Sequence, residues 1–223
     1  MKSTELEFIL FDLDNTLYPR TSGLFDHIDR LINRYLEKVI KIPAKEVDRL
    51  RRAYLAAHGT TLNGLIAHHA VDPYHYLDFV HDVPLADYLV PDAELAQLIA
   101  RLPGKKYIFS NASSSHCQRV LDYLGLSNLF SAVYDINYFN FRPKPDLAIY
   151  RELLDDIGGD PAKGIMIDDL IVNLEPAASL GMTTVFYDPA LKNPPLLPPQ
   201  GRSLNCLHRL PQLVTELRLR APN

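Results

Sequence analysis

The hydrophobic positions along this chain follow two alternating patterns. Short apolar runs are typical of buried strands, and they occur over residues 6–11, 106–110, 132–134, 164–168 and 183–187. Residues 204–207 give a weaker signal of the same kind. Between these runs, apolar residues recur at helical spacing over residues 113–125, 145–158 and 171–180. Strands that alternate with helices predict a parallel sheet that is covered by helices on both faces.

One long interval departs from this alternation. Residues 19–87 carry helical patterns, such as the spacing of Leu24 and Ile28, and almost no strand signal. The interval is far too long for a single crossover helix. We therefore expect an α/β core domain formed by residues 1–18 and 88–223, with residues 19–87 inserted as a helical domain. A movable cap and a bundle packed rigidly on the sheet both agree with this pattern.

The composition is that of an ordinary globular protein, with 47% hydrophobic and 22% charged residues among 223. The net charge of −4 gives no sign of a nucleic-acid-binding surface, and no apolar run is long enough to cross a bilayer. The N-terminus is acidic where a secretion signal would be basic and then apolar, and the isolated Cys117 and Cys206 are typical of reduced thiols. We expect a cytoplasmic protein that binds neither membranes nor nucleic acid polymers; its oligomeric state stays open.

Two carboxylates directly follow the first predicted strand. Asp12 and Asp14 are two positions apart, so both can project to one side if the extended geometry continues. Two carboxylates at one site repel each other unless one is protonated or a cation lies between them. The pair therefore suggests a metal or phosphate site at the C-terminal edge of the sheet, where open α/β folds hold their ligands. A strand-end aspartate followed by a turn-forming Asp-Asn pair explains the same residues.

A second acidic pair ends the fourth predicted strand. Asp168 and Asp169 are expected at the same edge of the same sheet as Asp12 and Asp14. Together these carboxylates can supply the ligands of one Mg²⁺ site, with phosphate oxygens and waters completing the shell. Asn173, one turn into the following helix, is placed to orient them.

Two further segments offer groups that can bind a phosphate. Ser110 and Asn111 end the second predicted strand just before a helix, where they can bind phosphoryl oxygens or cap the helix. Lys144 lies between two prolines that restrict the backbone. A fixed ammonium there would offset the charge of a transferring group, whereas a solvated surface lysine is the ordinary alternative.

The order of these motifs resembles that of the haloacid dehalogenase superfamily. Its four motifs correspond to Asp12-Leu13-Asp14-Asn15-Thr16, Ser110-Asn111, Lys144 and Asp168-Asp169, over roughly residues 7–190. The resemblance implies a Rossmann-like doubly wound parallel sheet, with residues 19–87 as a helical cap of the C1 type.

A narrower resemblance is to the pyrimidine 5′-nucleotidase subfamily. It rests on five segments, residues 11–19, 58–65, 80–81, 142–145 and 173–176. Leu170 departs from the subfamily pattern, which usually has Ser after the acidic pair. His58, Thr61 and Asn63 in the cap segment are candidates for contact with the substrate.

The superfamily resemblance implies a role for each motif residue in the reaction. Asp12 would be the nucleophile that forms an aspartyl-phosphate, and Asp14 would act as acid to the leaving group and as base to the hydrolytic water. Ser110 and Asn111 would bind phosphoryl oxygens, and Lys144 would stabilise their charge. Asp14 argues against a dehalogenase, because the dehalogenases of the superfamily lack an acid at this position and a halide needs no proton.

The resemblance also implies a metal ligand set and a substrate. Mg²⁺ would be held by Asp12, by the backbone carbonyl of Asp14 and by Asp169, with Asp168 as a direct or indirect partner. We expect a Mg²⁺-dependent phosphomonoesterase that acts on a small phosphorylated metabolite, foremost a pyrimidine nucleoside 5′-monophosphate. A phosphatase for sugar phosphates or other small metabolites, and a non-catalytic ligand-binding regulator on the same scaffold, are the alternatives.

Overall fold

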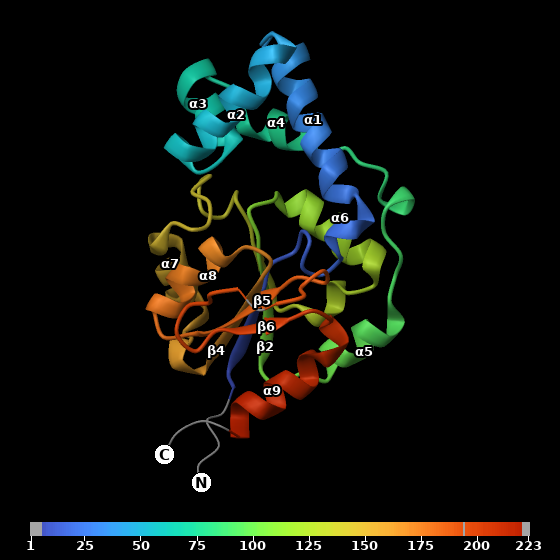
Figure 1. Cartoon of the computed structure of the whole chain (residues 1–223), viewed down its shortest axis with the longest axis vertical. Helices are drawn as coiled ribbons and strands as arrows, with labels where there is room; N and C mark the ends of the chain where they lie inside the picture. Colours follow the sequence, from blue (N-terminus) through green and yellow to red (C-terminus); the bar gives the residue numbers. More distant parts are fainter. Residues whose placement is uncertain (1–5, 194, 220–223) are drawn as a thin grey trace. The chain divides into compact units, whose positions relative to one another are not determined.

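The computed structural model describes residues 6–193 and 195–219 and forms two compact units (Figure 1). The first unit combines Met1–Pro19 with Val90–Asn223, and the second is Arg20–Leu89. Every strand among the described residues belongs to the first unit, and the second unit is helical.

Six parallel strands form one sheet in the first unit, in the order β3-β2-β1-β4-β5-β6. The strands are β1 (Phe8–Phe11), β2 (Lys105–Phe109), β3 (Ala132–Tyr134), β4 (Gly164–Asp168), β5 (Thr183–Tyr187) and β6 (Arg202–Leu204). The predicted parallel, doubly wound sheet is therefore confirmed. The strand order reverses direction between β1 and β4, and this switch point is where open α/β sheets bind their ligands.

The sixth strand lies earlier in the chain than predicted. It covers Arg202–Leu204, where it pairs with β5, whereas the apolar pattern indicated residues 204–207. After Leu204 the chain leaves the sheet and enters the 3-10 helix η5 (Leu207–Arg209). Leu204 and Leu207 are both buried, but Leu204 ends β6 and Leu207 begins η5. The apolar residues of two different elements therefore gave the pattern of a single strand.

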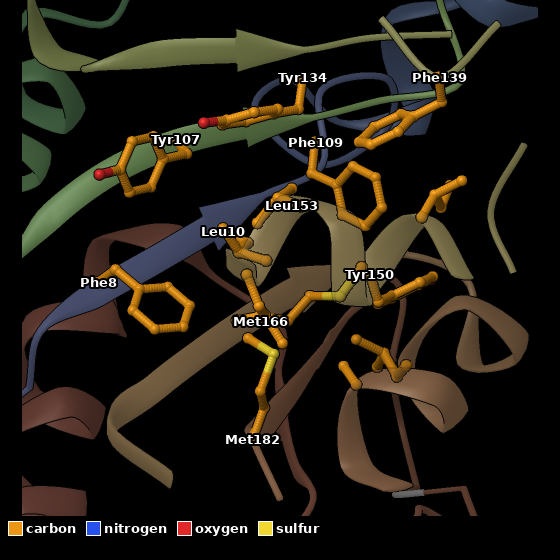
Figure 2. Close-up of a cluster of buried hydrophobic side chains, with 14 residues drawn as sticks. Phe8, Leu10, Tyr107, Phe109, Tyr134, Phe139, Tyr150, Leu153, Met166 and Met182 are labelled. Carbon is orange, nitrogen blue, oxygen red and sulfur yellow. The ribbon is translucent and has the colours of Figure 1, made fainter. Parts of the chain in front are cut away.

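Helices cover both faces of the sheet in the first unit (Figure 1). They are α5 (Ala93–Ala100), α6 (Ser114–Leu124), α7 (Leu147–Ile157), α8 (Ile171–Ser179) and α9 (Leu210–Leu219). On the face covered by α7 and α8, Phe8 and Leu10 of β1 join a buried cluster with Tyr150 (Figure 2). Successive strand residues point to opposite faces, so Ile9 and Phe11 are buried on the other side. This double coverage explains why β1 is apolar at all of its positions.

Four helices make up most of the second unit. They are α1 (Leu24–Lys38), α2 (Ala44–His58), α3 (Thr61–His69) and α4 (Pro73–Val80). The ring of Tyr35 in α1 packs edge-on against Tyr76 and Phe79 of α4, while Gly64 of α3 lies against Tyr54 of α2. The predicted helical character of the insert is confirmed, and its action as a cap remains a prediction.

Two expectations drawn from composition concern the described part of the chain. No helix there has both the length and the apolar character needed to cross a membrane. Cys117 is buried in α6 and Cys206 is partly exposed, and both are free thiols, as predicted.

The contact between Gly64 and Tyr54 gives a test of the helical unit. A Cβ at position 64 would lie 2.1 Å from Cγ and 2.5 Å from Cβ of Tyr54, atoms at the base of the side chain that cannot swing aside. We predict that Gly64→Ala lowers the free energy of unfolding by about 1–3 kcal/mol, the usual effect of overpacking. Urea denaturation followed by circular dichroism measures the change, with Ala67→Ser at an exposed position of α3 as the control. Equal midpoints for all three proteins would contradict the prediction.

Candidate active site

The polar residues singled out from the sequence converge at the C-terminal edge of the sheet. Asp12 follows β1, Ser110 follows β2 and Asp168 ends β4, and these three strands are neighbours. Backbone hydrogen bonds continue the sheet into the site: Asp12 N donates to Ile167 O at 2.9 Å, and Ser110 N donates to Tyr134 O at 3.0 Å. The sheet itself therefore sets the positions of these residues.

Lys144 joins the ends of the three strands. Its Nζ donates to Asp12 Oδ1 at 2.8 Å, to the backbone oxygen of Phe109 at 2.8 Å and to Asp168 Oδ2 at 2.7 Å, which uses all three donors of an ammonium. The residue is only 2% exposed, so the solvated surface lysine is ruled out. Burial lowers the pKa of Lys144, but the adjacent carboxylates of Asp12 and Asp168 outweigh it and raise the pKa above its usual value. Lys144 is therefore positively charged at neutral pH.

Asn111 fixes the backbone of Lys144. Its Oδ1 accepts from Lys144 N at 2.8 Å, and its Nδ2 donates to Lys144 O at 3.2 Å. These two bonds hold a peptide unit that is 33 positions away in the chain. The side-chain amide of Asn111 therefore positions Lys144 through its backbone. The sequence did not indicate this role.

The helix-capping alternative for Ser110 and Asn111 is wrong. The cap of α6 is Ser113, whose side chain accepts a hydrogen bond from His116 N. Ser110 is buried at the end of β2, and its Oγ accepts from Ala112 N at 3.1 Å. Phosphate binding by Ser110 and Asn111 remains a prediction.

Both oxygens of the Asp168 carboxylate accept hydrogen bonds. Its Oδ1 accepts from Leu170 N at 2.8 Å and from Asn173 Nδ2 at 3.0 Å. Its Oδ2 accepts from Lys144 Nζ at 2.7 Å and from the same amide of Asn173 at 3.1 Å. Asn173 thus lies where the sequence placed it, and Asp168 is held chiefly as the partner of Lys144.

Three carboxylates form the only cluster in residues 6–193 and 195–219 with at least three potential metal ligands. Oxygens of Asp12, Asp168 and Asp169 lie within 4.8 Å of one another. When all three carboxylates are ionised, three negative charges face the single ammonium of Lys144, and a divalent cation would balance the remainder. Because Asp168 already accepts several hydrogen bonds, Asp12 and Asp169 are the better ligands. This all-oxygen set fits a hard cation such as Mg²⁺.

Burial is the main reason why the pKa values of Asp12 and Asp169 are raised. Burial raises the pKa of Asp12 well above its usual value, because the charge of Lys144 offsets only part of the effect and Asp168 adds to it. Burial, aided by the negative charge of Asp168, raises the pKa of Asp169 to about 7. A bound cation would favour the ionised form of both groups.

Asp14 belongs to a separate hydrogen-bonded group. Its Oδ1 accepts from the hydroxyl of Tyr18 at 2.7 Å and lies 2.9 Å from His116 Nε2. Both partners are buried, Tyr18 at 3% and His116 at 1% exposed. Burial raises the pKa of Tyr18 well above its usual value, and the charge of Asp14 adds to the effect, so this hydroxyl stays a donor.

The two partners of Asp14 were missed by sequence reasoning. Tyr18 lies four residues after Asp14, and this short spacing in a turn was a signal that could have been used. His116 is 102 positions away and gives no local signal. Thr16, whose Oγ1 donates to Asp12 Oδ2 at 3.3 Å, is a third unassigned contact within the first motif.

The three candidates from the helical unit lie around the turn between α2 and α3. Asn63 Nδ2 donates to the backbone oxygen of His58 at 3.3 Å, and Thr61 is buried. His58 Nε2 lies 3.0 Å from His68 Nε2. Each therefore has a structural contact within its own unit, and contact with a substrate remains a prediction.

Comparison with known proteins shows the family of this chain. A family model described as haloacid dehalogenase-like hydrolase matches residues 6–181. The chain belongs to this family. The superfamily predicted from the four motifs is thereby confirmed.

This haloacid dehalogenase-like hydrolase is similar in sequence to one yeast protein and in fold to several solved structures. It is 28% identical over 193 residues to phosphate metabolism protein 8 of Saccharomyces cerevisiae. The matched region covers 79% of this chain and 60% of the yeast protein. The chain therefore spans about 60% of that relative's length. A phosphatase of the family from Thermococcus onnurineus has a TM-score of 0.63 at 17% identity, covering 93% of this chain and 97% of its own. A 2-haloacid dehalogenase from Pseudomonas syringae pv. Tomato DC3000 has a TM-score of 0.62 at 17% identity, covering 95% and 99%. These two likenesses show the shared fold.

The raised pKa of Asp169 predicts a pH-dependent stability for the metal-free protein. The folded state keeps a proton that the unfolded chain releases, since the pKa is about 7 in the fold and near 3.8 otherwise. Stability should therefore fall between about pH 4 and 7 and level off above pH 7. Thermal unfolding in EDTA across this range measures the slope. Asp169→Asn, which cannot titrate, should lose less stability over the same range, and identical slopes would contradict the assignment.

Proposed function

We propose that this hydrolase is a Mg²⁺-dependent phosphomonoesterase that works through an aspartyl-phosphate and acts on a pyrimidine nucleoside 5′-monophosphate. The observation that carries the proposal is that two carboxylates of one motif, Asp12 and Asp14, have different hydrogen-bond partners. Asp12 is held beside the buried ammonium of Lys144, whereas Asp14 is held by Tyr18 and His116. These different surroundings support attack by Asp12 and proton transfer by Asp14.

Asp12 is the nucleophile in this proposal. Both of its oxygens are oriented, Oδ1 by Lys144 and Oδ2 by Thr16. An oxygen of Asp12 forms a bond to phosphorus while the bond from phosphorus to the leaving oxygen breaks. Lys144 offsets the negative charge of the nucleophile and of the transferring group.

Asp14 carries the proton in both halves of the reaction. It gives a proton to the leaving oxygen, and then takes one from the water that cleaves the aspartyl-phosphate. Tyr18 and His116 fix the orientation of its carboxylate. A halide needs no such proton, so Asp14 supports phosphate-ester chemistry over dehalogenation.

The metal would be held by Asp12, Asp169 and the backbone carbonyl of Asp14. When bound, Mg²⁺ neutralises charge and orients phosphate oxygens. Ser110 and Asn111 would bind the phosphoryl oxygens at the end of β2. Because the side-chain amide of Asn111 is committed to Lys144, we assign its contribution to the backbone N–H.

The substrate assignment rests on the resemblance to pyrimidine 5′-nucleotidases in the motifs and in the segment that contains His58, Thr61 and Asn63. The chemistry at Asp12 and Asp14 would serve a sugar phosphate equally well, so the leaving group is selected elsewhere. A non-catalytic regulator would have no use for Asp14 as a proton carrier, which argues against that alternative.

Removal of the nucleophile tests the mechanism. We predict that Asp12→Asn lowers kcat on the order of 10⁴-fold or more, because the neutral amide cannot form the covalent intermediate. Initial rates with p-nitrophenyl phosphate measure the loss, and circular dichroism verifies the fold. Asp155→Asn, at an exposed position of α7, is the matched control and should retain full activity. Near-normal turnover in Asp12→Asn would remove Asp12 from the mechanism.

A substrate panel tests the remaining parts of the proposal. We expect UMP, CMP and dTMP to give kcat/KM values about tenfold or more above those for AMP, IMP and glucose 6-phosphate. EDTA should abolish all activity, and added Mg²⁺ should restore it. Preference for glucose 6-phosphate would overturn the substrate and keep the reaction class, whereas full activity in EDTA would overturn the metal.

A further inference from the structure

Asn15 has a backbone conformation that glycine would adopt with less strain. Its φ is 61°, in the left-handed region, and its side chain is buried, with the residue 6% exposed. Asparagine tolerates this region better than most residues, but glycine enters it freely. The backbone alone therefore gives no reason for an asparagine here, so the reason lies in its side chain.

One end of the Asn15 side chain contacts the acidic cluster. The side chain forms a hydrogen bond with Asp169 that lowers the pKa of that carboxyl, against the larger effect of burial. An ionised carboxylate can only accept hydrogen bonds, so the group that faces Asp169 is Nδ2. This bond restricts the orientation of Asp169 and favours its ionised form.

The other end of the side chain has no partner. Oδ1 of Asn15 is buried and accepts no hydrogen bond from any residue that the structure describes. Buried acceptors are almost always satisfied, so a donor from outside the chain is expected. Phosphate oxygens are themselves acceptors and do not fit. A water bound to a divalent cation is a strong donor, and Mg²⁺ usually keeps several of its waters.

We propose that Asn15 is a positioning residue of the metal site. Nδ2 orients Asp169 as a ligand, and Oδ1 accepts a hydrogen bond from a water on the cation. The proposal rests on the Mg²⁺ site of the proposed function. Outer partners of this kind commonly change metal affinity by about 10–100-fold. Asn15 contacts no reacting atom, so its loss should raise the Mg²⁺ requirement and leave turnover at saturating Mg²⁺ close to normal.

The test is Asn15→Gly, which keeps the left-handed backbone and removes both amide groups. Asn140→Gly is the matched control, because Asn140 also has a positive φ, 52°, but is exposed. Isothermal titration calorimetry of EDTA-stripped protein measures the Mg²⁺ dissociation constant. We expect it to rise about tenfold or more in Asn15→Gly and to stay unchanged in Asn140→Gly, with kcat at saturating Mg²⁺ within about threefold of wild type.

Asn15→Ala separates the side chain from backbone flexibility. It removes the same amide groups without the added freedom of glycine, so its Mg²⁺ affinity should fall as in Asn15→Gly. A loss seen in the glycine variant alone would overturn the inference, as would a dissociation constant within about twofold of wild type in both. If wild type itself binds no Mg²⁺, the proposed metal site fails, and this inference fails with it.

Discussion

The buried ammonium of Lys144 is the interaction on which the site depends. It lies among two carboxylates and a backbone oxygen that come from the ends of β1, β2 and β4. A buried charge is tolerated only when it is paired and hydrogen-bonded. The buried ammonium therefore requires the carboxylates of Asp12 and Asp168 as its partners. Asn111 and Asn173 complete the arrangement, one by holding the backbone of Lys144 and the other by holding Asp168. Ion pairs and hydrogen bonds to Lys144 thereby connect the ends of the three strands.

The two aspartates of the first motif belong to different networks although they are two residues apart. Asp12 lies among charges, next to Lys144, Asp168 and Asp169. Asp14 lies against the hydroxyl of Tyr18 and the ring of a buried histidine. In the proposed mechanism, these different surroundings separate attack on phosphorus by Asp12 from proton transfer by Asp14. The fold alone does not supply this distinction, since it is shared with a phosphatase and a dehalogenase.

The fold and the position of the site were largely predictable from the sequence. Continuous apolar strands in alternation with helices predict a parallel sheet, and parallel strands bring their C-terminal ends to one edge. The acidic pairs after the first and fourth strands were therefore expected to meet, and Asp12, Asp168 and Asp169 do so. The strand signal failed at the edge of the sheet, because the spacing of Leu204 and Leu207 crosses the end of β6.

The sequence by itself determined which elements form, which residue types reach the sheet edge and in what order. Only the tertiary structure decided the pairing of polar side chains. Lys144 contacts Asp12 across 132 positions, His116 reaches Asp14 across 102, and Asn111 binds the backbone of Lys144 rather than capping a helix. The physical reason is that hydrophobic periodicity is a local property of the chain. A hydrogen bond between distant residues, in contrast, depends on strand order and loop geometry, which exist only once the sheet has assembled.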